Sequence, residues 1–118
     1  MKYSELDILR TALEIRGELV DKGETDFEGD SLECWDIRIN SRLTRCAGKC
    51  HYRESYIELS LPLFEIEENF LTQLRNTVLH EFAHAIVGAE IRNGRRDHHG
   101  WRWKSAMLRI GGDPTDRS

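Results

Sequence analysis

Apolar residues recur at helical intervals in three parts of this 118-residue chain, and the first part lies at the N-terminus. Residues 4–21 open with a Ser-Glu-Leu-Asp sequence that resembles a capping box. Leucines and a valine follow at near-helical spacing. The pattern therefore predicts an N-terminal amphipathic helix, whose apolar positions are Leu6, Leu9, Leu13 and Val20.

The second and third helical patterns lie in the C-terminal half of the chain. Between Phe64 and Val87 the apolar positions are Phe70, Leu71, Leu74, Val78, Leu79, Phe82, Ala85 and Ile86. Gly88 then marks the expected helix end. A closing helix is predicted where Trp103, Met107 and Ile110 share a face before the glycine pair at 111–112.

Period-two alternation marks the strands. Residues 35–39 and 57–61 alternate apolar with polar side chains, and Pro62 closes the second run. A further strand is expected at Ala47–Gly48, entered by a turn or bulge. Residues 22–31 and 90–97 are polar and predict loops. The predicted fold class is α+β, with an N-terminal helix, a short antiparallel sheet, a central helix and a closing helix.

Composition favours one intracellular domain spanning residues 1–118. A hydrophobic content of 39% with three tryptophans supports one folded core, and no repeat or low-complexity segment occurs. No apolar run approaches the ~18 residues of a membrane span. Glu5 and Asp7 lie where a signal peptide is basic and then apolar. We therefore expect a soluble, cytoplasmic protein without a membrane partner.

The central helix carries the pentapeptide His80-Glu81-Phe82-Ala83-His84. Histidines four residues apart leave the same helix face, so both imidazoles can reach one Zn²⁺. Glu81, beside the first histidine, can reach a water molecule that the metal activates. The motif predicts a zinc hydrolase site in which His80 and His84 bind the metal and Glu81 is the general base.

Catalytic zinc takes three protein ligands and keeps a fourth position open, so a third donor is expected. His98 and His99 are candidates, because they follow the polar loop at the start of the closing helix. Glu90 competes with them, since it lies where a shorter zinc-protease motif places its last histidine. Gly88 is one position late for the tight turn of that motif, which disfavours Glu90.

Three separated blocks of the chain resemble the SprT-like domain, the zinc-protease domain of the SprT and Spartan family. The blocks are His80-Glu81-x-x-His84-Ala85, His99-Gly100-x-x-Trp103, and the segment 40–50 followed by residues 57–60. The resemblance spans about residues 35–110 and selects His99 over His98. It implies a small zincin-like domain with one catalytic Zn²⁺ that hydrolyses peptide bonds, with protein crosslinked to DNA as a substrate.

Relatives in that family often carry a separate C-terminal zinc-binding module. We do not expect one here, because the chain ends shortly after Pro114. Cys46, Cys50 and His51 offer further soft donors, but a second zinc needs four ligands and their spacing is not that of a zinc ribbon. Cys34 is the only other thiol. We therefore expect three reduced cysteines, with Cys46 and Cys50 as half-buried strand residues.

Basic residues cluster in two segments, although the net charge is −4. Residues 38–53 carry five basic side chains and no acid, and residues 92–109 carry six with one acid. If both segments lie near the metal they can hold a phosphate backbone, with an aromatic ring stacked on a base. Solvated surface arginines explain the pattern equally well. The candidate DNA or substrate contacts are Arg42, Arg45, Lys49, Arg92, Arg95, Arg96 and Trp101.

These observations predict a zinc metallopeptidase in which Glu81 takes a proton from water and returns it to the leaving amide. An extended polypeptide substrate is expected along the sheet edge, with weak binding of single-stranded DNA and a recruiting partner protein. A deformylase-like hydrolase would need a cysteine ligand in another context. The alternative from a different class is a non-catalytic, zinc-containing module that binds nucleic acid or protein, with His98 as a fourth ligand.

Overall fold

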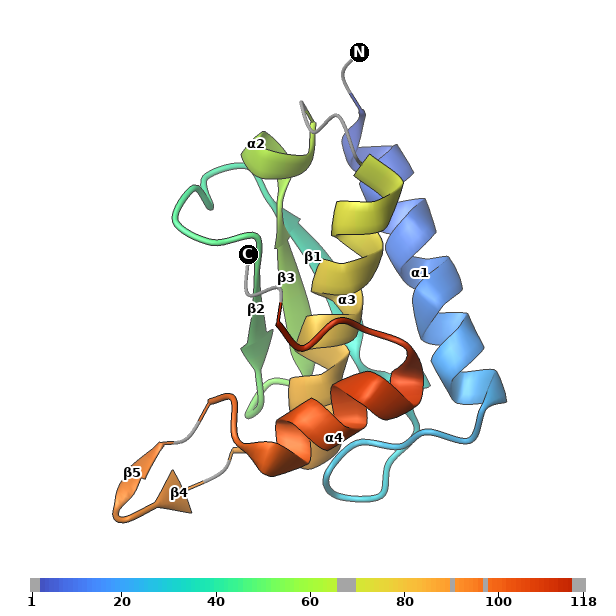
Figure 1. Cartoon of the computed structure of the whole chain (residues 1–118). Helices are drawn as coiled ribbons and strands as arrows, with labels where there is room; N and C mark the ends of the chain where they lie inside the picture. The colour runs from blue at the N-terminus through green and yellow to red at the C-terminus, as the bar shows by residue number, and fades with distance from the viewer. Residues whose placement is uncertain (1–2, 66–69, 90, 97, 116–118) are drawn as a thin grey trace.

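The computed structural model describes residues 3–65, 70–89, 91–96 and 98–115. Its elements are, in order, α1 (Glu5–Asp21), a 3₁₀ turn η1 (Leu32–Cys34), β1 (Asp36–Asn40), β2 (Gly48–His51), β3 (Tyr56–Ser60), α2 (Leu61–Phe64), α3 (Phe70–Val87), β4 (Ile91–Arg92), β5 (Arg95–Arg96) and α4 (Trp101–Ile110). Figure 1 shows α3 in the middle, between α1 and the β2 side of the sheet, with α4 across its C-terminal half. The predicted combination of helices with a small sheet is confirmed.

Helix α1 begins as predicted but buries a different face. The Ser4 hydroxyl accepts a hydrogen bond from the Asp7 amide at 3.1 Å, and the Asp7 carboxylate accepts one from the Ser4 amide at 2.9 Å. The buried residues are Ile8, Ala12, Ile15 and Leu19. Leu6 and Leu13 are 59% and 38% exposed, so their assignment to the packed face was wrong. Two apolar stripes satisfy the helical period here, and only tertiary packing decides which one is buried.

The three-stranded sheet has the order β1-β3-β2. Strand β3 pairs parallel with β1 and antiparallel with β2. The predicted antiparallel sheet is therefore wrong for the β1–β3 pair. The chain leaves β1 for the far edge, forms β2 there, and returns between them as β3 (Figure 1). Side-chain alternation is the same for both strand directions, so the sequence pattern could not distinguish them.

The helix predicted between Phe64 and Val87 is present as α3, and a separate short helix, α2, ends at Phe64. The Ser60 hydroxyl accepts a hydrogen bond from the Leu63 amide at 3.1 Å and caps the single turn α2, which has Pro62 in its first turn. Residues 66–69 lie outside the described part of the chain, and α3 begins at Phe70. Helix α3 is buried on most of its surface, because it packs against α1, the sheet and α4.

The polar loop of residues 22–31 is tied to the core by Asp26. This residue is 6% exposed, and its Oδ2 accepts a hydrogen bond from the Trp35 indole at 2.9 Å. Its Oδ1 accepts hydrogen bonds from the amides of Glu28 and Asp30 at 2.8 and 2.9 Å. Burial opposes the charge, but these hydrogen bonds outweigh it and hold the pKa of Asp26 below its ordinary value.

The segment after α3 contains more structure than predicted. Gly88 ends the helix as expected, with φ of 82° and an amide that donates to the His84 carbonyl at 2.7 Å. The stretch 90–97, predicted as a loop, contains the antiparallel ribbon β4–β5. Asn93 and Gly94 both have positive φ, as a type I′ hairpin turn requires. Helix α4 ends at Gly111, also as predicted.

None of the helices in the described ranges combines the length and apolar character needed to cross a membrane.

Candidate metal centre

Helix α3 places His80, Glu81 and His84 in the interior of the molecule. Their exposed fractions are 8%, 6% and 8%. The imidazole centroids of His80 and His84 lie 5.0 Å apart, as the i, i+4 spacing predicts. Glu81 Oε2 lies 3.9 Å from His80 Nε2. Burying three polar side chains this close together is unfavourable unless a partner compensates for the lost hydration.

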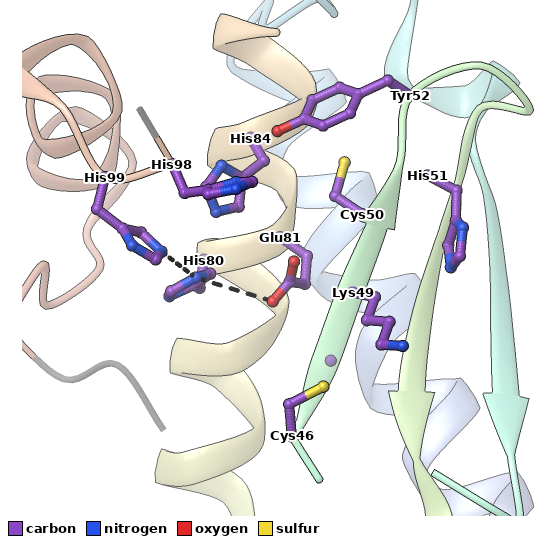
Figure 2. A pocket seen from close by; sticks show the side chains of 11 residues that line it. Cys46, Lys49, Cys50, His51, Tyr52, His80, Glu81, His84, His98 and His99 are labelled. Carbon is purple, nitrogen blue, oxygen red and sulfur yellow. Dashed lines mark hydrogen bonds and ion pairs between the residues drawn. The ribbon is translucent and has the colours of Figure 1, made fainter. Parts of the chain in front are cut away.

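The turn before α4 brings His99 to the same point. His99 Nε2 lies 3.1 Å from His80 Nε2, and the centroids of His99 and His84 are 5.2 Å apart. The ligand nitrogens of the three histidines all lie within 4.8 Å of one another. Figure 2 shows His99 reaching across to His80 from the segment that precedes α4. The structure thus gathers the three residues that the sequence suggested as ligands.

Of the two rival ligands, the structure describes only His98, and His98 does not belong to this group. His98 is exposed and lines the same cavity, with its ring 6.4 Å from that of His99. Glu90 lies outside the described residues. Among the residues that the structure describes, no fourth histidine, cysteine or acidic side chain joins the three imidazoles. The described residues thus supply three ligands for a metal ion, and these three line the cavity.

Trp103 of α4 forms one wall of the site. Its indole Nε1 donates a hydrogen bond to the His80 carbonyl at 3.2 Å. The indole ring stacks on His84 at 5.5 Å and meets the rings of His80 and His99 edge-on at 4.7 and 4.6 Å. From the sequence, Trp103 was placed on the apolar face of the closing helix and in the block His99-Gly100-x-x-Trp103, but it was given no role at the metal. Its spacing, four residues after His99, places it one helical turn from a ligand and was the available signal.

Burial controls the protonation of the site. Burial, together with the neighbouring imidazoles of His80, His99 and His98, lowers the pKa of His84 to about 3. His84 is therefore uncharged near neutral pH and keeps a lone pair for a metal. Burial also raises the pKa of Glu81 to about 8. Both directions follow from removing a charged group from water.

The donor set fits a divalent metal ion. Ring nitrogens of the three histidines lie close together, and the uncharged His84 imidazole offers a lone pair. A cation bound between the three rings would satisfy these nitrogens. Three histidines with one open position are typical of catalytic metal sites, whereas structural sites are closed by four protein ligands.

A cavity of about 340 Å³ opens beside the imidazoles, and β2 forms its opposite wall. Gly48 and Cys50 line it from this edge strand, and Tyr52 lines it from the residue that follows. Figure 2 shows β2 facing α3 across the cavity. The ring of Tyr52 meets His84 edge-on at 6.5 Å and Phe27 at 6.1 Å. Tyr52 was not identified from the sequence. It follows Cys50 by two residues, the interval at which side chains of an extended chain lie on the same side.

The cysteines match the expectation of reduced thiols rather than that of a second zinc site. All three are free thiols: Cys34 is exposed, and Cys46 and Cys50 are half-buried at the cavity, near α3. None belongs to a potential metal-binding group in the described part of the chain. Burial and the nearby Glu81 carboxylate raise the pKa of Cys50, so its thiol stays protonated.

The predicted DNA contacts lie at two places rather than in one patch. Arg42 and Arg45 are exposed on the loop before β2, and Lys49 is exposed on β2 itself. Arg95 is exposed on the β4–β5 ribbon, which Figure 1 shows beyond the opposite end of β2. The side chains of Arg92 and Arg96 lie outside the described part. Trp101 is 70% exposed at the start of α4.

Comparisons with known proteins identify relatives of this chain. The chain is 35% identical over 91 residues to the "DNA-dependent metalloprotease dvc-1" of Caenorhabditis elegans, covering 71% of the chain and 24% of that protein. It is 32% identical over 101 residues to the "DNA-dependent metalloprotease SPRTN" of Xenopus tropicalis, covering 82% of the chain and 22% of the relative. The chain thus spans less than a quarter of the length of these curated relatives. The sequence profile of the SprT-like family matches residues 18–117. The chain therefore belongs to the SprT-like family.

Proposed function

We propose that this domain is a zinc metallopeptidase of zincin-like architecture. The observation that carries the proposal is the convergence of His80, His84 and His99 within 4.8 Å, with the Glu81 carboxylate beside them at an open cavity. Such a constellation has the parts that hydrolysis requires, namely a metal site with a free position and a base next to it.

In this mechanism the three histidines hold Zn²⁺, which when bound supplies Lewis-acid chemistry that acidifies water and polarises a carbonyl. A cation held by the histidines would favour the charged form of Glu81 and so offset the effect of burial on its pKa. The Glu81 carboxylate, whose Oε2 lies on the His80 side, would then accept a proton from the attacking water. The same oxygen then passes the proton to the leaving amide nitrogen. Trp103 fixes the orientation of the ligands, because its ring contacts all three imidazoles.

The substrate is a polypeptide that lies extended along β2. This strand is at the sheet edge and faces the metal ligands, so its main chain can pair with a substrate main chain of any sequence. Proteins crosslinked to DNA are the substrate class that we favour. Two features support it: the relatives bear the name DNA-dependent metalloprotease, and exposed basic residues flank both ends of β2.

The proposal includes a cytoplasmic location. It also includes a partner protein that recruits the enzyme, because a chain with a net charge of −4 binds DNA weakly by itself. The alternative is a zinc-containing module that binds protein or nucleic acid without cleaving it. Glu81 separates the two: a structural site needs no buried carboxylate beside the metal, and here one is present.

The decisive experiment compares wild type with Glu81→Gln and with Glu54→Gln as the exposed control. Zinc content is measured by elemental analysis, and cleavage of casein is measured with and without single-stranded DNA. We expect one zinc per chain in all three proteins, and proteolysis reduced by about 10²- to 10⁴-fold in Glu81→Gln alone. Zinc binding without proteolysis in the wild type would instead identify the binding module.

A further inference from the structure

Gly48 lies where the edge strand approaches the catalytic helix most closely. A methyl group added at this position would be 3.1 Å from Glu81 Cγ, 3.2 Å from Thr77 Cγ2 and 3.0 Å from the Glu58 carbonyl oxygen. Each distance is shorter than ordinary van der Waals contact between such atoms. Any side chain at position 48 would therefore occupy space that Glu81 and its neighbours now fill.

The neighbours differ in how easily they can move. The Glu58 carbonyl belongs to β3, which is paired on both sides, so its position is fixed by two ladders. Thr77 is 3% exposed on α3, the helix packed against α1, the sheet and α4. Glu81 is different, because its carboxylate end faces the cavity and a change in its side-chain rotamer relieves the crowding. Crowding at position 48 would thus act on the Glu81 side chain.

We propose that Gly48 is a positioning residue for the general base: the missing side chain lets β2 approach α3 while Glu81 keeps its carboxylate beside the metal ligands. This inference rests on the proposed function, in which Glu81 is that base. Gly48 does not touch the reacting atoms. It acts through Glu81, and a shift of about 1 Å in a catalytic group is enough to reduce turnover about 100-fold.

The kinetic test compares Gly48→Ala with wild type and with Gly17→Ala. Gly17 is a matched control, because a methyl group there meets nothing within 4 Å. For Gly48→Ala we expect the kcat for casein cleavage to fall about 10- to 100-fold, with KM and zinc content unchanged. Gly17→Ala should keep all three values. A Gly48→Ala enzyme with wild-type kcat would overturn the inference.

A stability test examines the same contact without any catalysis. Melting midpoints are measured on metal-free wild type, Gly48→Ala, Glu81→Ala and the double variant. Overpacking should lower the midpoint of Gly48→Ala by about 4 to 10 °C in the wild-type background. The loss should be at most about half as large with Glu81→Ala, because the Cγ that is crowded has been removed. Equal losses in both backgrounds would show that Gly48 does not act on Glu81.

The two tests separate the inference from the proposed function. A zinc-loaded wild type that cleaves no casein contradicts the proposed function, whereas an active wild type with an equally active Gly48→Ala contradicts only the role of Gly48. If Gly48→Ala does not fold, Gly48→Ala with Thr77→Ser takes its place, because removing Thr77 Cγ2 makes room on one side. Reduced kcat in that folded variant supports the inference, and wild-type kcat overturns it.

Discussion

The two walls of the cavity contribute to the site in opposite ways. The helical wall, formed by α3 and the segment before α4, supplies side chains, of which His80, Glu81 and His84 are buried. Trp103 of α4 packs against the three imidazoles. The strand wall, formed by β2, supplies space and main chain. Its inward residues at the cavity are a glycine and a thiol that stays protonated. The position of Glu81 on the helical wall thus depends on the absence of a side chain at Gly48 on the strand wall.

This difference explains which parts of the site can be changed. Helix α3 holds its ligands at fixed spacing, so removing any one of them should have a large effect on metal binding. Strand β2 lies close to α3, so adding atoms to β2 should disturb the site more than removing them. Substitutions on each wall test this difference, and those on the helical wall should have the largest effects.

Loss of a ligand on the helical side should have the largest effect. His80→Ala, His84→Ala and His99→Ala should each weaken zinc binding by more than about 100-fold, since even partners behind the ligands contribute 10- to 100-fold. Proteolysis should fall to background with the metal. Zinc content after dialysis against a chelator of known affinity gives the measurement.

His98→Ala is the matched control, because His98 lines the cavity without joining the three-histidine group. It should keep both its zinc and its activity. If His98→Ala lost the metal while His99→Ala retained it, the ligand set would be His80, His84 and His98, and the arrangement before α4 would differ from the one described.

The contrast between the walls also explains what the sequence could predict. His80, Glu81 and His84 were found because a helix converts spacing directly into shared direction. His99 needed the family resemblance, since its approach depends on how the chain folds back after α3. The role of Gly48 and the parallel β1–β3 pair were missed, because both depend on strand order rather than on local pattern.

Two further errors have different physical origins. The wrong buried face of α1 arose because Leu6 and Leu13 match the helical period as well as Ile8 and Ile15 do. Local periodicity identifies the element but not its neighbour. The β4–β5 ribbon is different: Asn93-Gly94 is a recognised hairpin signal, and it was available in the sequence.

Trp103→Phe tests whether the helical wall also orients its ligands. The change removes the indole donor to the His80 carbonyl but keeps an aromatic ring against the imidazoles. We expect zinc affinity to fall about 10-fold, by analogy with other groups that orient metal ligands. Trp101→Phe is the control, because Trp101 is 70% exposed and should leave affinity unchanged. Equal affinity in both variants would limit Trp103 to packing.

Asp26 tests the junction between the walls. Its loop carries Phe27, whose amide donates to the Ala85 carbonyl of α3 and whose ring meets Tyr52 beyond β2. Asp26→Asn replaces a buried acceptor of charge-assisted hydrogen bonds and should lower the free energy of unfolding by about 2 kcal/mol at pH 7. Urea unfolding measures this loss, and Asp30→Asn on the exposed part of the loop is the control.

The pH dependence of this loss has a definite sign. The pKa of Asp26 is lower in the folded chain than its ordinary value of 3.8, so its contribution is complete above that value. It disappears as the pH falls through the lower folded value. The difference between wild type and Asp26→Asn should therefore be constant from pH 7 to about 5 and shrink below about 4. A constant difference at pH 3 would contradict the charged state assigned to Asp26.

The smallest effect is expected for DNA, at the two ends of the strand wall. Single-stranded DNA should bind weakly, with a dissociation constant on the order of 10⁻⁵ M that rises with salt. Reversal of Arg92, Arg95 and Arg96 to Glu tests the ribbon end, and reversal of Arg42, Arg45 and Lys49 tests the loop end. If one DNA strand spans the cleft, each triple variant should weaken binding. Each should also reduce the slope of log affinity against log salt concentration by about 2.

Fluorescence anisotropy at several salt concentrations measures the affinity and its salt dependence. If only one triple variant lost affinity, DNA would bind at that end of β2 alone. If salt did not weaken binding, the charge of this chain would give no support to a DNA-crosslinked substrate.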